Sequence, residues 1–138
     1  MTMKRFIPML LAAMAAVAVV AHASSPGVFA HQWGGHTRYL TITKKGHGSE
    51  WIDSGCCDHV IDLTFVVTHA GGTVTRGDAT IRVLTVHVKD HSEFTKKHPA
   101  PHVGQIGHLH LRNHVLRETL TRTIYCDAVS GSKGTCGA

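Results

Sequence analysis

The chain lacks the short motifs that identify many common enzyme classes. It has no phosphate-binding loop, no dinucleotide-binding fingerprint, no zinc-finger spacing and no G-x-S-x-G nucleophile elbow. Its single asparagine, Asn113, does not belong to an N-glycosylation sequon, and no internal repeat is visible. The sequence therefore gives no motif-based evidence for a nucleotide-dependent enzyme, a dehydrogenase or a serine hydrolase.

Only one stretch is strongly apolar, and it lies at the start of the chain. Lys4 and Arg5 form a short basic region, residues 6–20 are rich in Ala, Leu, Met and Val, and residues 21–23 read Ala-His-Ala. This order is typical of a secretory signal peptide, and the apolar run is shorter than the roughly 20 residues of a spanning helix. We expect residues 1–23 to be removed, with no membrane span afterwards. A cut after Ala30, which would leave His31 as the amino terminus, stays open.

Acidic residues are few, yet the chain is only mildly basic. Nine Asp and Glu face fourteen Lys and Arg, which gives a formal charge of +5, or +3 without Lys4 and Arg5. Such a charge is too small to predict a nucleic-acid partner. Histidine is abundant instead, with thirteen in the chain and all but His22 beyond the expected cleavage site. Because an unperturbed imidazole titrates near pH 6.5, we expect the mature surface to become strongly basic in mildly acidic surroundings.

Four cysteines in an exported chain predict two disulfides. They are Cys56, Cys57, Cys126 and Cys136. A bridge between adjacent cysteines is strained, so we expect Cys56 and Cys57 to be joined to the two C-terminal cysteines, in an order that the sequence does not decide. The expected location is therefore extracellular, or periplasmic if the organism is a bacterium.

The stretch from Ile61 to Val88 predicts a long β-hairpin. Apolar side chains alternate from Ile61 to Val67, residues 70–72 read Ala-Gly-Gly, and a second β-rich run follows from Ala79. The alternation slips near residues 83–84, which indicates a bulge or a strand buried on both faces.

Shorter strands are predicted on both sides of this hairpin. They cover residues 36–44, the region of Trp51 and Ile52, and residues 108–111. Residues 115–126 fit either a helix or a strand, and their threonines favour a strand. Residues 89–104 contain two prolines and predict a long surface loop. We therefore expect an all-β fold, a small antiparallel β-sandwich or partly open barrel over residues 36–138, after an N-terminal arm at residues 24–35 in which Trp33 packs on the sheet.

Histidines provide one possible metal site. On a strand, His108 and His110 point to the same side, so their imidazoles could share one zinc or copper(II) ion. His114 keeps the same parity if the strand runs straight, although Asn113 and His114 could instead form a turn. The competing interpretation is a solvated histidine-rich face.

Three functions remain open at this stage. The first is a small secreted binding protein without catalytic activity, effector- or toxin-like and related to virulence, that acts on a protein or surface ligand outside the producing cell. Its contact surface would lie in the loop that carries Lys96, Lys97, His98 and His102. The second is an extracellular or periplasmic zinc- or copper-binding protein. The third is a ribonuclease-like hydrolase, in which histidines act with Asp62, Asp90 or Glu118 and nearby arginines. The composition favours the first.

Overall fold

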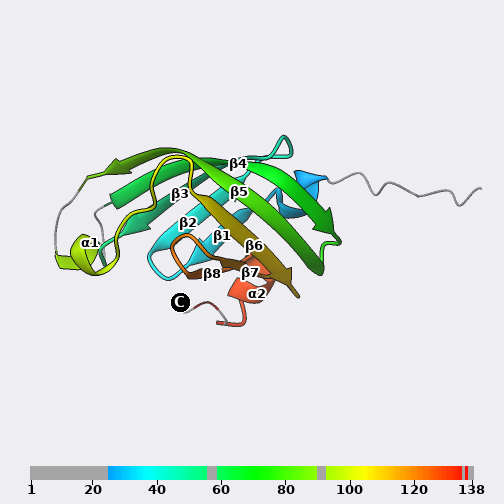
Figure 1. Cartoon of the computed structure of the whole chain (residues 1–138). Helices are drawn as coiled ribbons and strands as arrows, with labels where there is room; N and C mark the ends of the chain where they lie inside the picture. The colour runs from blue at the N-terminus through cyan, green and yellow to red at the C-terminus, as the bar shows by residue number, and fades with distance from the viewer. Residues whose placement is uncertain (1–24, 56–58, 90–92, 135, 137–138) are drawn as a thin grey trace, which may run out of the picture.

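The strands of the chain form one closed antiparallel barrel. The computed structural model describes residues 25–55, 59–89, 93–134 and 136. In this part of the chain, eight strands follow one another around the barrel in sequence order (Figure 1). The elements are η1 (Pro26–Phe29), β1 (Gln32–Gly35), β2 (Arg38–Ile42), β3 (His47–Asp53), β4 (His59–Gly72), β5 (Arg76–Val88), α1 (Glu93–Lys97), β6 (Ile106–Arg112), β7 (Val115–Glu118), β8 (Thr123–Cys126) and α2 (Ala128–Gly131). The all-β antiparallel prediction is confirmed, but the sheet is a closed barrel and not the sandwich or partly open barrel that we expected.

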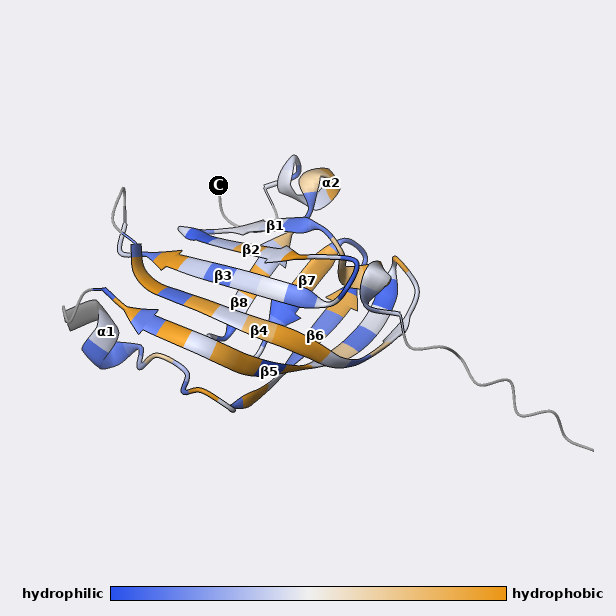
Figure 2. Cartoon of the chain, turned by 90° about the horizontal axis from the view of Figure 1, so that it is seen from above, coloured by the Kyte–Doolittle hydropathy of each residue, from blue (hydrophilic) through white to orange (hydrophobic). Residues whose placement is uncertain are grey.

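The long hairpin of β4 and β5 spans the whole length of the barrel. Leu63 and Phe65 point inward and Thr64 points outward, as the alternation predicts, and Figure 2 shows the resulting stripes of hydropathy along the strands. The turn lies at residues 73–75, later than the predicted Ala-Gly-Gly break. Gly72 instead ends β4, where its φ of +114° and the close approach of the Arg76 carbonyl oxygen leave no space for a side chain.

Two bulges interrupt this hairpin. The register shifts between Thr64 and Phe65, where Leu84 is the extra residue on β5, and again between Val67 and His69. The bulge predicted near residues 83–84 is therefore confirmed. Because a bulge bends a strand and increases its twist, two bulges in one ribbon help to curl it towards closure.

The segment expected to be an N-terminal arm forms part of the barrel. Residues 32–35 are strand β1, which pairs with β2 and meets β8 at a single register position, Gly34 opposite Cys126. Trp33 is buried, as expected, and its indole N–H donates to the carbonyl oxygen of Phe29 at 3.0 Å. The barrel therefore begins at Gln32, four residues before the expected start of the domain. The predicted signal peptide lies outside the described residues.

The region between residues 115 and 126 contains two strands joined by a turn, so the preference for strand is confirmed but a single strand is not formed. The turn is held by Glu118, whose carboxylate accepts the backbone N–H groups of Leu120 and Thr121. Positive φ angles of 48° and 70° at Asn113 and His114 place the preceding turn between β6 and β7, as the alternative interpretation of these two residues predicts.

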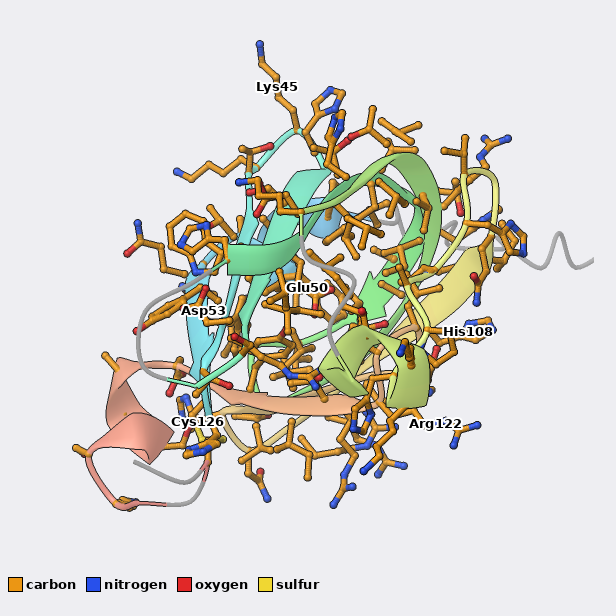
Figure 3. The ribbon with its side chains drawn as sticks, turned by 90° about the vertical axis from the view of Figure 1, so that its left-hand side faces the viewer. Lys45, Glu50, Asp53, His108, Arg122 and Cys126 are labelled. Carbon is orange, nitrogen blue, oxygen red and sulfur yellow. A yellow bond between two sulfur atoms is a disulfide. The ribbon has the colours of Figure 1, made fainter. Side chains whose placement is uncertain are left out.

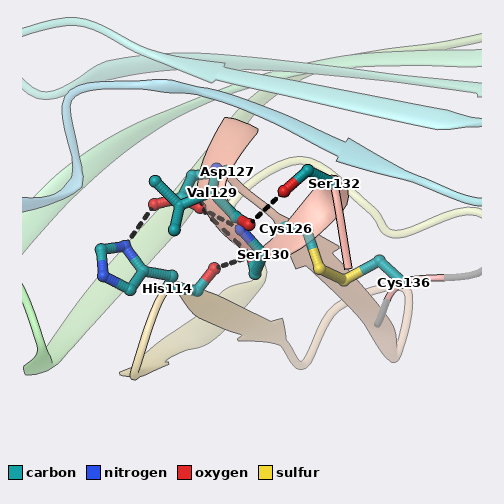
Figure 4. Close-up of a disulfide and its surroundings, with 7 residues drawn as sticks. All are labelled: His114, Cys126, Asp127, Val129, Ser130, Ser132 and Cys136. Carbon is teal, nitrogen blue, oxygen red and sulfur yellow. Dashed lines mark hydrogen bonds and ion pairs between the residues drawn. A yellow bond between two sulfur atoms is a disulfide. The ribbon is translucent and has the colours of Figure 1, made fainter. Parts of the chain in front are cut away.

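The described cysteines pair in an order that corrects our expectation. Cys126 is bonded to Cys136, only ten residues away (Figure 4), so neither is joined to the Cys56–Cys57 pair. Helix α2 makes this short loop possible because the Asp127 side chain accepts the backbone N–H groups of Val129 and Ser130 and turns the chain back. Cys56 and Cys57 lie outside the described residues.

The segment that follows β5 was predicted to be a surface loop, but part of it is buried. It contains the short helix α1, and beyond it Ala100 packs against the core and Pro101 is buried. Within the described ranges, neither helix is long or apolar enough to span a membrane. The second half of this loop covers one end of the barrel, and this position determines the site described next.

Candidate functional site

A cavity of about 350 Å³ lies where residues 97–105 cross the end of the barrel. Ile52 from β3, Ile61 from β4 and Leu120 from the β7–β8 turn supply apolar wall. Ala100 and the two prolines of the loop close the other side. The volume of this cavity lies in the range of small-molecule sites in other proteins, and its lining is partly apolar.

Cationic side chains border the same cavity. Arg38 from β2, Lys97 from α1 and Arg122 from the β7–β8 turn all line it, together with His98. No Asp or Glu contributes to the lining among the described residues. A cavity that combines apolar wall with several convergent cations suits a ligand that has an apolar body and an anionic group.

Two glutamates are buried behind this lining. Glu50 and Glu118 are each only 2% exposed, and they point inward from β3 and β7 because their positions alternate with outward residues. Figure 3, which looks at the barrel from the α1 end, places Glu50 inside the ring of strands. Burial of a carboxylate in a barrel core is costly unless the charge is paired, hydrogen-bonded or neutralised by a proton.

Hydrogen bonds link the two carboxyl groups through one threonine. The Thr121 hydroxyl lies 2.6 Å from Oε2 of Glu118 and 2.9 Å from Oε1 of Glu50. The Tyr125 hydroxyl donates to the same Oε1 of Glu50 at 2.5 Å. Burial, followed by the charge of Glu50, raises the pKa of Tyr125 well above 10, so the phenol remains a donor.

Counting protons shows that this cluster fits one ionised and one neutral carboxyl. A hydroxyl has a single proton, so Thr121 can donate to only one of the two glutamates at a time. Both contacts become hydrogen bonds when the other carboxyl has a proton of its own and donates to the Thr121 oxygen. All of these contacts can therefore be hydrogen bonds when the two carboxyl groups hold one proton between them.

Glu50 is the better holder of that proton. Burial and the charge of Glu118 raise the pKa of Glu50 to about 7. Burial also raises the pKa of Glu118, but hydrogen bonds from Thr121 and Leu120 oppose the shift and favour its anion. Oε2 of Glu50 is buried and has no hydrogen-bond partner in the described part of the chain. It is a polar atom that a neighbouring water or ligand group could satisfy.

Arg38 connects the buried carboxyl groups to the cavity. One of its guanidinium nitrogens donates to the Thr123 hydroxyl at 2.5 Å and to the Thr121 carbonyl oxygen at 3.3 Å. Its charge lowers the pKa of both Glu50 and Glu118, in each case as a minor contribution. A ligand in the cavity would therefore meet Arg38 and Thr121 directly and the glutamates through them.

The predicted histidine set does not gather at one point. His108 and His110 lie side by side on the outside of β6, with ring centroids 6.2 Å apart, as their spacing predicts. His114 is in the following turn and contacts Asp127 at 2.6 Å (Figure 4). Among the described residues, no group of three or more His, Cys, Asp or Glu is arranged to hold a metal ion.

Part of the predicted contact loop does reach the site. Lys97 and His98 line the cavity, whereas Lys96 and His102 are exposed on the same loop and do not. Of the acids considered for hydrolysis, Glu118 is buried in the barrel and Asp62 contacts His59 and Lys89 on the outside. Asp90 lies outside the described residues. Sequence reasoning missed Glu50, Arg38, Thr121 and Tyr125.

Searches against known protein families, curated proteins and solved structures find no match to this chain.

Proposed function

We propose that this protein is a binding protein for a small organic anion, which it holds in the cavity at the α1 end of the barrel. The observation that supports this most directly is the lining itself, because apolar side chains and the cations Arg38, Lys97 and Arg122 converge on one cavity. An anionic group would pair with the cations, and an apolar body would be removed from water against Ile52 and Ile61. The proposal keeps the expectation of a non-catalytic, exported binding protein and makes its partner a small molecule.

The buried acid pair supports the preference for an anion. With a proton on Glu50, the interior behind the cavity contains one carboxylate, Glu118, opposite one guanidinium, Arg38, so the cations of the rim are not cancelled. When Glu50 ionises above its pKa of about 7, a second negative charge appears behind Arg38. We therefore expect anion affinity to fall as the pH rises from 6 to 8.

The test compares two adjacent lysines. Calorimetric titration with medium-chain and aromatic carboxylates, each matched to its uncharged primary amide, should show saturable binding of at least one carboxylate and much weaker binding of its amide. Lys97→Ala should weaken carboxylate binding by about threefold to fivefold, the effect of an exposed charge at a binding rim. Lys96→Ala removes the same charge from the same helix but does not touch the cavity.

Two results would count against the proposal. Equal affinity for carboxylates and amides would remove the role of the cations. Equal losses in the Lys96 and Lys97 variants would show that long-range charge, not the cavity, attracts the ligand.

A further inference from the structure

The outside of the barrel is charged unevenly. We define the basic face as the outward side chains of β5, β6, β7 and β8 together with the β7–β8 turn. Five of the six arginines of the described residues belong to it, along with three histidines. They are Arg76, Arg82, Arg112, Arg117, Arg122, His87, His108 and His110. In the described part of these strands and their turn, Asp78 is the one acidic residue whose side chain points outward.

The carboxylate of Asp78 is already paired with neighbouring side chains. Its carboxylate contacts His110 at 2.7 Å and Arg112 at 3.1 Å, and the hydrogen bond from His110 is the main reason that its pKa is lowered. In the described part of the chain, no carboxylate lies within ion-pair distance of Arg82, Arg117 or Arg122. The face therefore has a surplus of positive charge available to a partner.

A hollow on this face could receive one anionic group. The lining of a depression of about 370 Å³ beside the β7–β8 turn consists of Arg117, Glu118, Thr119, Arg122, Thr123 and Ile124. The Glu118 carboxylate accepts hydrogen bonds from the backbone of that turn, and the two arginines are exposed. Register pairing places Arg117 between His110 on one side and Ile124 on the other. Two guanidinium groups at one depression suit a phosphate, because their planar donors match its oxygens.

Exposed aliphatic side chains border the basic face. Leu84, Ile106 and Val103 are 43%, 51% and 63% exposed. Ile106 lies directly opposite Arg82 in the sheet, and hydrogen bonds of Val83 with Gln105 and Gly104 hold the Val103 loop beside Leu84. These groups provide apolar contacts next to the cations.

Among the side chains that the structure describes, the exposed aromatic rings are on another part of the barrel. Tyr39 and Trp51 lie opposite each other on the outside of β2 and β3, with ring centroids 5.4 Å apart. Proteins that bind single-stranded nucleic acids stack the bases on aromatic side chains that lie among cationic residues. The basic face combines cations with aliphatic groups instead, which is the combination that membrane-surface proteins use.

We propose that the basic face docks on a bilayer that contains anionic lipids. Arginines, among them Arg82, Arg117 and Arg122, bind lipid phosphates, with one headgroup in the hollow, and Leu84, Val103 and Ile106 enter the boundary between headgroups and acyl chains. Arg122 lines both the hollow and the cavity, whereas Arg82, Arg117 and Ile106 do not line the cavity. Variants of these three residues therefore test membrane docking separately from the function proposed for the cavity.

Co-sedimentation with vesicles tests the proposal. The full chain should sediment with vesicles of phosphatidylcholine mixed with phosphatidylglycerol, remain in solution with pure phosphatidylcholine, and be released by added salt. The double variant R82E/R117E should lose about tenfold or more in binding. The matched control K45E/K133E makes the same change of charge at exposed sites on other parts of the molecule and should bind nearly as well as the wild type.

A second variant separates insertion from simple charge attraction. Ile106→Ser should reduce binding to anionic vesicles while leaving the charge unchanged. Thermal unfolding checks that each variant is folded, and R82Q/R117Q replaces the charge reversal if that variant does not fold. Equal losses in the two charge-reversal variants would overturn the proposal. So would an unchanged affinity in Ile106→Ser, or a single-stranded oligonucleotide that displaces the protein from vesicles at equal phosphate concentration.

Discussion

The inner wall made by β4, β5 and β6 differs in chemistry from the wall made by β2, β3, β7 and β8. The first is wholly apolar at its buried positions, with Leu63, Phe65, Ile81 and Leu109 among them. The second buries Glu50, Glu118 and Tyr125 and directs Arg38 into the same space. Both walls follow the same alternation of inward and outward residues. Alternation therefore decides which positions face the interior, but not whether the side chains at those positions are apolar or polar.

The difference separates two kinds of contribution to stability. Apolar side chains contribute through area removed from water, which does not depend on pH. The buried acids of the other wall make its contribution depend on pH, because a second buried carboxylate would have no charge partner of its own. Three experiments test this difference between the two walls.

The largest effect should come from the apolar wall. Phe65 is fully buried, and its ring covers Gly48 so closely that a Cβ on Gly48 would lie 2.1 Å from it. Phe65→Ala should lower the free energy of unfolding by about 3–5 kcal/mol, the usual cost of removing a buried phenyl ring. Urea unfolding at pH 5 and pH 8 should give the same loss at both pH values. The outward neighbour Thr64→Ala is the control and should change stability by less than about 1 kcal/mol.

A pH-dependent effect should come from Glu50→Gln. The folded protein binds the Glu50 proton more tightly than the unfolded chain does, because its pKa is about 7 in the fold and 4.5 in an unperturbed glutamate. Wild-type stability should therefore fall as the pH rises from about 4.5 to about 7, by about 3 kcal/mol in total. Glutamine cannot ionise, so the variant should gain on the wild type across that range.

Unfolding measured over this pH range checks the sign. Asp78→Asn is the control, since the pKa of Asp78 is lowered and its contribution to stability is present at neutral pH and lost as the pH falls. A Glu50→Gln variant whose difference from the wild type does not change between pH 4.5 and pH 8 would show that Glu50 has no raised pKa.

The smallest effect should come from Tyr125→Phe. It removes the hydroxyl that donates to Oε1 of Glu50 and leaves the ring in place. We expect a loss of about 1–2 kcal/mol below pH 6. The tyrosine hydrogen bond also lowers the pKa of Glu50, so its removal should move the pH at which stability falls to a higher value. A stability curve with an unchanged midpoint would contradict the hydrogen bond's effect on Glu50.

Alternation of apolar residues was enough to predict the hairpin of β4 and β5 and its bulge near Leu84. The strand predicted around Trp51 and Ile52 is confirmed as β3, but no pattern in the sequence indicated that Glu50 lies inside and Trp51 outside. A solvated face is the ordinary place for a glutamate, and nothing local to residues 47–53 indicates that Thr121 and Tyr125, more than 70 positions away, supply its hydrogen bonds. The cavity could not be predicted either, because its lining comes from three strands, the helix α1, a turn and a loop.

The pairing of the cysteines was also not predictable from the sequence. The expected pairing rested on the strain of a vicinal bridge, whereas the observed Cys126–Cys136 pairing depends on the tight reversal at Asp127 and α2. Sequence spacing does not reveal that reversal. His108 and His110, in contrast, needed only the two-residue period of one strand, and their shared outward direction was predicted correctly.

The narrow pairing between β1 and β8 has a consequence for how water reaches the interior. These strands meet at one register position, Gly34 with Cys126, whereas β4 and β5 share eleven. Opening along this line would separate Tyr125 from the strands opposite it while the hairpin stayed intact. Amide hydrogens of β8 should therefore exchange with deuterated solvent sooner than those of β4. The same brief opening would give the Glu50 carboxyl its route for exchanging a proton with the surroundings.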